Sequence, residues 1–261
     1  MLEPAIIRRV YRRRVVVLAY HCVLRNPDAV TPRSGIPLVS FLEQITWLER
    51  NGFHFISGAS LERYLLEAGE LPACPVLITV DDGFRNYALE MLPVFEAHNV
   101  PSILFVTTDY LDQKRPYSFV RWRGEPARAH DQFLSLESSE LVQLARHPLV
   151  EIGAHTCSHP NLRALPPAEA QREILDSKIR LEDLLDRPIR YFAYPYGESS
   201  DALRQFNSKQ FRLGFSVKQG TNGRSADPHL LRRNSLGMRK RSLRLLRAYD
   251  ALRVLDGFRE K

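Results

Sequence analysis

Two adjacent carboxylates stand at the end of a continuous apolar run. The run is Pro75 to Val80, and Asp81, Asp82 and Gly83 follow it at once. Unpaired charge is expensive to bury, so carboxylates in this position face an opening or bind a cation. Because neighbouring side chains of an extended chain point in different directions, one carboxylate can hold a metal while the other stays free.

Two histidines four residues apart form the second candidate group. His155 and His159 come shortly after another apolar run, Leu149 to Gly153. Residues with this spacing can share one face of a helical turn and converge on one ion, although the spacing alone is weak evidence. Combined with Asp82, the pair predicts a divalent metal with open coordination positions, as a catalytic site requires.

The elements that must position these residues follow from the hydrophobic pattern. Short apolar runs alternate with longer amphipathic segments, which is typical of β-α units around a parallel sheet. The expected strands are 15–20, 54–56, 75–80, 102–106, 149–153, 191–194 and 211–217. The expected helices are 39–51, 60–66, 87–98, 138–146, a long helix from after 166–167 to 185, and an amphipathic helix at about 241–256. Both candidate groups therefore come just after strands.

Three short motifs give the chain a resemblance to a known family. Residues 79–83 (TVDDG), 155–159 (HTCSH) and 194–197 (YPYG) resemble the signature motifs of the polysaccharide deacetylases, which share the nodulation-factor deacetylase homology domain. The resemblance extends from about Val15 to Arg233. It implies an α/β fold, an irregular (β/α)7-type barrel, with the site at the carboxyl ends of the strands. We expect residues 1–261 to form one such domain.

The resemblance also implies a role for each matching residue. Asp82, His155 and His159 would bind the metal, Asp81 would be the general base, and the backbone N–H of Tyr196 would stabilise the oxyanion. The implied reaction removes N-acetyl groups from amino-sugar residues of a polysaccharide, an oligosaccharide or a lipid-linked glycan precursor. Zinc is the expected metal, although cobalt, nickel and iron suit the same ligands.

The chain departs from the family pattern in three places. Ala193 stands where well-studied relatives carry an arginine that braces the catalytic aspartate. Either another cation, such as Arg85 or Lys218, takes over that contact with Asp81, or the basicity of Asp81 is less tuned. An aspartate and tryptophan motif has no clear counterpart. Two places after Leu231 stands Arg233, where the family usually has histidine. The proton donor for the leaving amine is therefore not identified by position.

Two histidines outside the motifs are candidates for that donor. We prefer His21, at the end of the first expected strand, over the alternative of a hydrogen-bonded structural histidine; His229 is expected to be an exposed loop residue. Tyr196, Tyr117 and Trp122 are candidates for stacking on sugar faces, although aromatic loop residues pack as often as they bind ligands.

The segment 107–136 has little periodicity and is too long for an ordinary connection. Long irregular loops on a rigid scaffold are often lids or binding loops, and a packed surface excursion is the other interpretation. The sequence leaves both open.

Basic residues concentrate at the two ends of a chain whose formal net charge is +7. The segment 1–14 and residues 239–247 could contact an anionic membrane or form a solvated face. No nucleic-acid-binding signature accompanies them, so nucleic acid is an unlikely partner. The three scattered cysteines fit a reducing compartment, and the apolar run at 15–19 is short and lacks a cleavage site. We expect a cytoplasmic protein that could also rest on the surface of the inner membrane.

Two further functions are compatible with the same residues. The chain could hydrolyse another amide or ester on this fold, or it could be a non-catalytic glycan-binding protein that lost the family's arginine and histidine. Release of acetate from an acetylated chito-oligosaccharide separates the deacetylase from both.

Overall fold

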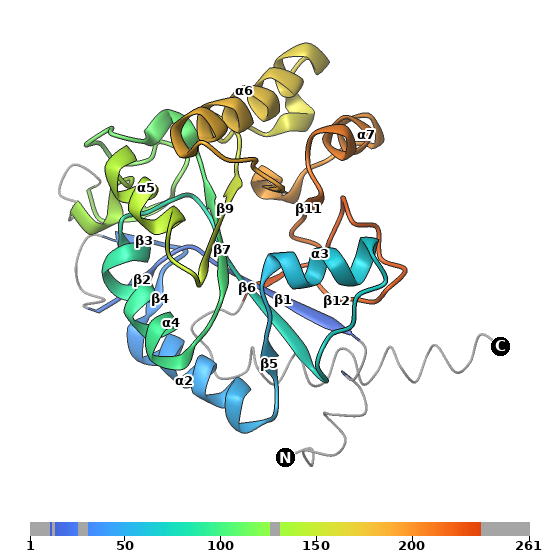
Figure 1. Cartoon of the computed structure of the whole chain (residues 1–261). Helices are drawn as coiled ribbons and strands as arrows, with labels where there is room; N and C mark the ends of the chain where they lie inside the picture. The colour runs from blue at the N-terminus through green and yellow to red at the C-terminus, as the bar shows by residue number, and fades with distance from the viewer. Residues whose placement is uncertain (1–10, 12–13, 26–30, 126–130, 236–261) are drawn as a thin grey trace.

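Continuous apolar runs form the central strands of the molecule. The computed structural model describes residues 11, 14–25, 31–125 and 131–235 (Figure 1). The long central strands β1 (Val15–Tyr20), β6 (Pro75–Val80) and β7 (Ser102–Val106) are buried at every residue. Parallel strands covered on both faces have such uninterrupted apolar sequences. The sheet continues through β9 (Val150–Ala154), β10 (Tyr191–Ala193) and β11 (Leu213–Phe215).

The strand order places the carboxyl ends of these strands at one edge. The path is β11-β10-β9-β7-β6-β1-β12, in which β12 (Thr221–Asn222) is antiparallel to β1. Two short strands pair beside it in parallel, β5 (His54–Phe55) with β6 and β13 (Asn234–Ser235) with β1. The sheet curls into a half-barrel of the (β/α)7 type, which confirms the predicted fold class.

Five helices cover the outer face of this curled sheet. In Figure 1, α2, α4 and α5 lie on one side of the central strands, and α6 and α7 continue this layer beside β9 and β11. Alternate strand residues such as Val16, Leu18, Val76 and Ile78 pack into this layer. The helices are α2 (Leu38–Arg50), α4 (Leu92–His98), α5 (Ser138–Ala145), α6 (Pro167–Leu185) and α7 (Asp201–Gln210).

Helix α3 (Gly58–Leu66) packs on the inner face instead. Its Leu61 and Tyr64 contact the other set of strand residues, which includes Val17 and Leu77. The backbone N–H groups of Gly58 and Ala59 donate to the carboxylate of Glu151, near the start of β9. Helix α3 therefore closes the barrel at the amino ends of the strands, which leaves the opposite end for a site.

The pattern predicted the central strands well and the peripheral elements less well. Strands 15–20, 75–80 and 102–106 are confirmed at their predicted bounds. The last expected strand is shorter than predicted, and the helix expected at 87–98 begins with a π-helical turn, Tyr87–Met91. Helix α7 was not predicted, because it is mostly polar and buries only Leu203 and Asn207.

Several expectations concern residues that the structure does not describe. The terminal helix at about 241–256, most of the basic segment 1–14 and the basic residues 239–247 lie outside the described residues. Membrane contact through these ends and a cytoplasmic location therefore stay predictions. Within the described part of the chain, no helix combines the length and the apolar character that crossing a membrane requires.

The described part of segment 107–136 packs against the barrel. Tyr110, Tyr117 and Phe133 form a small apolar cluster with Phe84. Two residues of the segment, in β8 (Trp122–Arg123), pair with β3 (Thr31–Pro32), and nearby β2 (Val23–Leu24) pairs with β4 (Ile36–Pro37). This packing agrees with the interpretation as a packed excursion, and the excursion also forms one wall of the site described below.

Glu62 on α3 is the charged group on which the closed end of the barrel depends. Its side chain is 2% exposed and accepts hydrogen bonds from Arg190 and from Arg212, which lie before β10 and β11. Burial would raise the pKa of Glu62, but the two guanidinium groups bring it below its usual value. The carboxylate therefore stabilises the fold above its unfolded-state pKa of about 4.3, and this stabilisation is lost as the pH falls through the folded-state pKa.

Replacement of this carboxylate tests the closure of the barrel. Glu62→Gln is expected to lower the free energy of unfolding at pH 7 by about 1–3 kcal/mol, measured by urea denaturation, because both arginines lose a charged acceptor. The difference from wild type should shrink as the pH falls below about 4. The control is Glu67→Gln, at the half-exposed second partner of Arg212. Equal losses in the two variants would contradict this role of Glu62.

Candidate metal centre and active site

Asp82, His155 and His159 lie together at the carboxyl ends of β6 and β9. All three are buried, and one ligand atom from each falls within 4.8 Å of the others. The Oδ1 atom of Asp82 is 3.7 Å from Nε2 of His155 and 3.8 Å from Nε2 of His159. These distances are too long for hydrogen bonds. Metal bonds of about 2.0–2.1 Å in a tetrahedral arrangement hold neighbouring ligand atoms about 3.4 Å apart, so small movements would let the three residues share an ion.

Unusual backbone conformations aim these side chains. Asp82 (φ 78°), Thr156 (φ 67°), His159 (φ 63°) and Tyr196 (φ 56°) all adopt the left-handed region. Such conformations cost of order 1–3 kcal/mol each in a residue other than glycine, and they cluster at functional sites. The expectation of a helical turn for the two histidines is wrong, because residues 155–160 form an irregular loop with two left-handed residues.

Helix α6 holds this loop in place. The carboxylate of Glu173 accepts hydrogen bonds from the backbone N–H groups of Cys157 and Ser158, at 2.9 Å each. The hydroxyl oxygen of Thr156 accepts another from the N–H of His159. The described residues lining the site cavity do not include Cys157.

A backbone carbonyl selects the metal-binding nitrogen of His155. The Nδ1 atom of His155 is 2.7 Å from the carbonyl oxygen of Ala193, so Nδ1–H donates and Nε2 keeps its lone pair toward Asp82. A hydrogen bond of this kind commonly orients a metal-binding histidine. Burial lowers the pKa of His155 and brings that of His159 to about 2, so both rings are neutral, as metal ligation requires.

Arg233 braces Asp81, and the expectation of Arg85 or Lys218 is wrong. The Nη1 atom of Arg233 is 2.6 Å from Oδ1 of Asp81, and its Nε donates to the carbonyl oxygen of Ser216. Arg85 instead pairs with Glu140, and Lys218 is exposed. Burial would raise the pKa of Asp81, but the Arg233 guanidinium holds it below its usual range, so the carboxylate is ionised.

The segment that follows β11 brings Arg233 to Asp81. Leu231 forms a parallel bridge with Phe215, and the N–H of Arg233 donates to the carbonyl oxygen of Lys218. These contacts carry the completely buried Arg233 side chain toward Asp81. In the sequence, Arg233 stands two places after Leu231, where the family usually has histidine, and this position by itself does not indicate a contact with Asp81.

Two of the other predicted residues line the same cavity. His21 and Tyr196 line a cavity of about 450 Å³, and Asp81 and the three candidate metal ligands line it as well. The N–H of Asp81 donates to the carbonyl oxygen of Tyr20, so the pairing of β1 with β6 places His21 beside the two aspartates. The Tyr196 side chain is 51% exposed at the rim.

The aromatic expectations are corrected in part. Tyr117 is buried and donates its hydroxyl hydrogen to the carbonyl oxygen of Asp82, so it cannot stack on a sugar. Trp122 is half-buried, and its indole N–H donates to the carbonyl oxygen of Tyr117. Sequence reasoning missed Phe119, whose ring stacks on that of His159 at a centroid distance of 3.9 Å. Its position in an irregular segment gave no signal for this contact.

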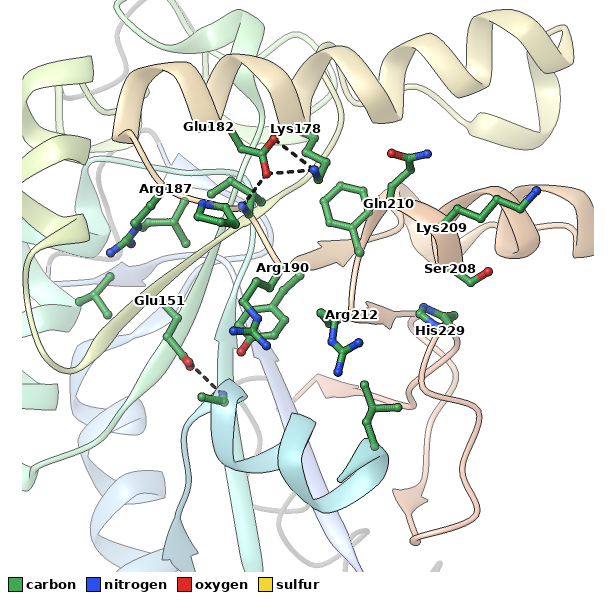
Figure 2. Close-up of a pocket in the computed structure, with 18 residues that line it drawn as sticks. Glu151, Lys178, Glu182, Arg187, Arg190, Ser208, Lys209, Gln210, Arg212 and His229 are labelled. Carbon is green, nitrogen blue, oxygen red and sulfur yellow. Dashed lines mark hydrogen bonds and ion pairs between the residues drawn. The ribbon is translucent and has the colours of Figure 1, made fainter. Parts of the chain in front are cut away.

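His229 lies in a different cavity, at the amino ends of the strands. The cavity has a volume of about 770 Å³, and Figure 2 shows it between α3, α6 and α7, with His229 near Arg212. None of the three candidate metal ligands lines it. His229 is half-buried rather than exposed, and burial lowers its pKa. Lys178, Glu182 and Glu151 of the same cavity are engaged in ion pairs or helix contacts.

The fold and the site define an α/β barrel with a candidate metal centre at the carboxyl ends of its strands. The family model for polysaccharide deacetylase matches residues 68–212, a range that contains all three motifs. The chain belongs to the polysaccharide deacetylase family, as its motifs predicted.

Relatives agree with this assignment. The chain is 22% identical over 206 residues to the poly-beta-1,6-N-acetyl-D-glucosamine N-deacetylase of Escherichia coli (strain K12), a match that covers 68% of this chain and 30% of that protein. The chain therefore spans less than a third of the length of that relative.

Two solved structures share the fold over almost their whole length. One is the Streptococcus pyogenes deacetylase PplD in complex with acetate, with 20% identity, a TM-score of 0.74 and coverage of 90% of this chain and 98% of that one. The other is IcaB from Ammonifex degensii, with 23% identity, a TM-score of 0.74 and coverage of 91% and 97%. At these identities the likeness shows the fold.

Removal of Arg233 tests the brace directly. Arg233→Ala is expected to lower the free energy of unfolding by about 3–5 kcal/mol, because it leaves the Asp81 carboxylate buried without its partner. Lys218→Ala, at an exposed position, should stay within about 0.5 kcal/mol of wild type. The double variant Asp81→Asn/Arg233→Met should recover much of the loss in urea denaturation. A fully stable Arg233→Ala protein would exclude the brace.

Proposed function

We propose that the protein is a metal-dependent hydrolase that removes N-acetyl groups from amino-sugar residues of a polysaccharide, an oligosaccharide or a lipid-linked glycan precursor. One observation carries the proposal: an ionised Asp81, braced by Arg233, lies beside a three-residue metal-ligand cluster in an open cavity. Family membership and the name of the Escherichia coli relative support the deacetylation of N-acetylated glycans.

The cluster suits a single divalent cation, with zinc as the proposed ion. Asp82, His155 and His159 offer one carboxylate and two neutral imidazoles, which leaves room for further ligands. The cation would supply Lewis acidity, which activates water and polarises the amide carbonyl.

Asp81 is the proposed general base. Its carboxylate is buried, ionised and free of the metal-ligand set, so it can accept the proton of the attacking water. Arg233 holds one carboxylate oxygen, Oδ1, which fixes the orientation of the group.

Tyr196 and His21 have the two remaining proposed roles. The backbone N–H of Tyr196 stabilises the negative charge on the former carbonyl oxygen, a contact worth about 3–4 kcal/mol in comparable sites. The left-handed conformation of Tyr196 fixes the direction of this N–H. His21 lines the cavity beside both aspartates and donates a proton to the leaving amine.

Separate variants distinguish the two aspartates. Asp81→Asn is expected to keep its metal and to lose about 10²–10⁴-fold in kcat, because the general base is gone. His155→Ala should instead lose the metal, measured by elemental analysis after dialysis. The assay is acetate release from an acetylated chito-oligosaccharide by metal-stripped and reconstituted protein.

These measurements test the deacetylase activity and the roles of the two aspartates. No acetate from any acetylated glycan with fully loaded protein would overturn the deacetylase. Loss of metal from Asp81→Asn, with metal retained in Asp82→Asn, would reverse the two roles.

His21 is tested with two leaving groups. His21→Gln should lower kcat for an N-acetylated oligosaccharide by about 10²-fold, since an amine must be protonated as it leaves. Hydrolysis of 4-nitrophenyl acetate should change far less, because a phenolate leaves without a proton. Equal effects on both substrates would indicate a structural role for His21.

A further inference from the structure

Two arginines that line the site cavity have no carboxylate partner among the described residues. Arg33 and Arg121 line the cavity that Asp81 and the three candidate metal ligands also line. Both arginines are exposed. In the described part of the chain, neither guanidinium forms an ion pair. Other exposed arginines do so, for example Arg25 with Glu90.

The backbone fixes the position of these two residues. The N–H of Arg33 donates to the carbonyl oxygen of Arg121 at 2.7 Å, and the Nε atom of Arg33 donates to that of Trp122 at 3.1 Å. These bonds continue the β3–β8 ladder. The two terminal nitrogens of Arg33 make no hydrogen bond within the described residues, so they are available to a ligand.

Arg121 lines the same cavity as Tyr196. Burial raises the pKa of the Tyr196 hydroxyl, and the positive charge of Arg121 acts against this rise, which places the guanidinium within electrostatic reach of Tyr196. The exposed side chains of Tyr196 and Val217 complete the rim. The lining of the cavity therefore combines two guanidinium groups with the exposed side chains of Tyr196 and Val217.

The charges inside the cavity leave these arginines uncompensated. Asp81 and Asp82 are the carboxylates of the lining, and Arg233 already neutralises Asp81. Asp82 belongs to the metal-ligand set, and a divalent cation there would bring more positive charge than Asp82 balances. A neutral glycan would leave this excess unmatched.

We propose that the substrate is an N-acetylated glycan with an anionic group, a uronate carboxylate or a phosphodiester, near the amino sugar that is deacetylated, and that Arg33 and Arg121 bind this group. The guanidinium fork matches both carboxylate and phosphate oxygens. This inference rests on the proposed function, because the acetamido group must face Asp82, His155 and His159 for the rest of the glycan to reach Arg33 and Arg121.

Three acetylated oligosaccharides of equal length test the inference. One is a neutral N-acetylglucosamine oligomer, the second alternates N-acetylglucosamine with glucuronate, and the third joins N-acetylglucosamine units by phosphodiesters. The kcat/KM for acetate release should be at least about tenfold higher for one of the anionic substrates at low salt. This advantage should fall as ionic strength rises to about 1 M, where the Debye length is about 3 Å.

Substitutions connect the preference to the two arginines. Arg33→Gln and Arg121→Gln should lower kcat/KM for the preferred anionic substrate by at least about tenfold more than for the neutral one. The lysine variants, which keep the charge but not the fork, should retain part of the preference. Arg172→Gln, on the exposed side of α6 and away from the cavity, is the matched control and should change neither value.

The outcomes separate this inference from the proposed function. If acetate is released equally from all three substrates, or if the glutamine variants slow all of them equally, the inference is wrong and the deacetylase stands. If no substrate releases acetate, calorimetric binding to metal-loaded Asp81→Asn decides. Selective binding of an anionic oligomer that Arg33→Gln and Arg121→Gln abolish would uphold the inference alone, and equal binding of all three would overturn it.

Discussion

Two carboxylates buried side by side can both stay ionised only if each has its own cation. In this chain the cation for Asp81 is Arg233, at 2.6 Å, and the position of Asp82 between two neutral imidazoles suits a metal ion. This division assigns the two adjacent residues different chemistry. In the proposed mechanism, Asp81, which has a protein partner, is the base, and Asp82 is a metal ligand.

The two ends of the barrel differ: the end at the amino termini of the strands is closed, and the end at their carboxyl termini holds the candidate site. At the amino ends of the strands, α3 fills the interior and Glu62 ties it to Arg190 and Arg212. At the carboxyl ends, loops with left-handed residues replace close packing and aim polar side chains into a cavity. Because the sheet and α3 hold the ends of these loops firmly, the fold can sustain strained conformations at the site.

The described part of the segment 107–136 contacts two of the candidate metal ligands and also lines the site cavity. Tyr117 bonds the backbone of Asp82, and Phe119 stacks on His159. Two residues further on, Arg121 stands directly before β8, and its carbonyl oxygen accepts a hydrogen bond from the backbone N–H of Arg33. The same segment therefore contacts two candidate metal ligands and contributes Arg121, one of the two arginines proposed to bind the substrate.

The sequence by itself predicted the long central strands and the three candidate metal ligands that the fold brings together. Uninterrupted apolar runs such as Val15–Tyr20 are local signals of buried strands, and motifs after strand ends point to one edge of a parallel sheet. The tertiary structure decided which cation meets Asp81. That contact joins residues 152 positions apart, through a segment whose course past β11 depends on long-range pairing, and no local pattern encodes such a pairing. For the same reason, the burial of Tyr117 and the position of His229 at the far end of the barrel became visible only in the folded chain.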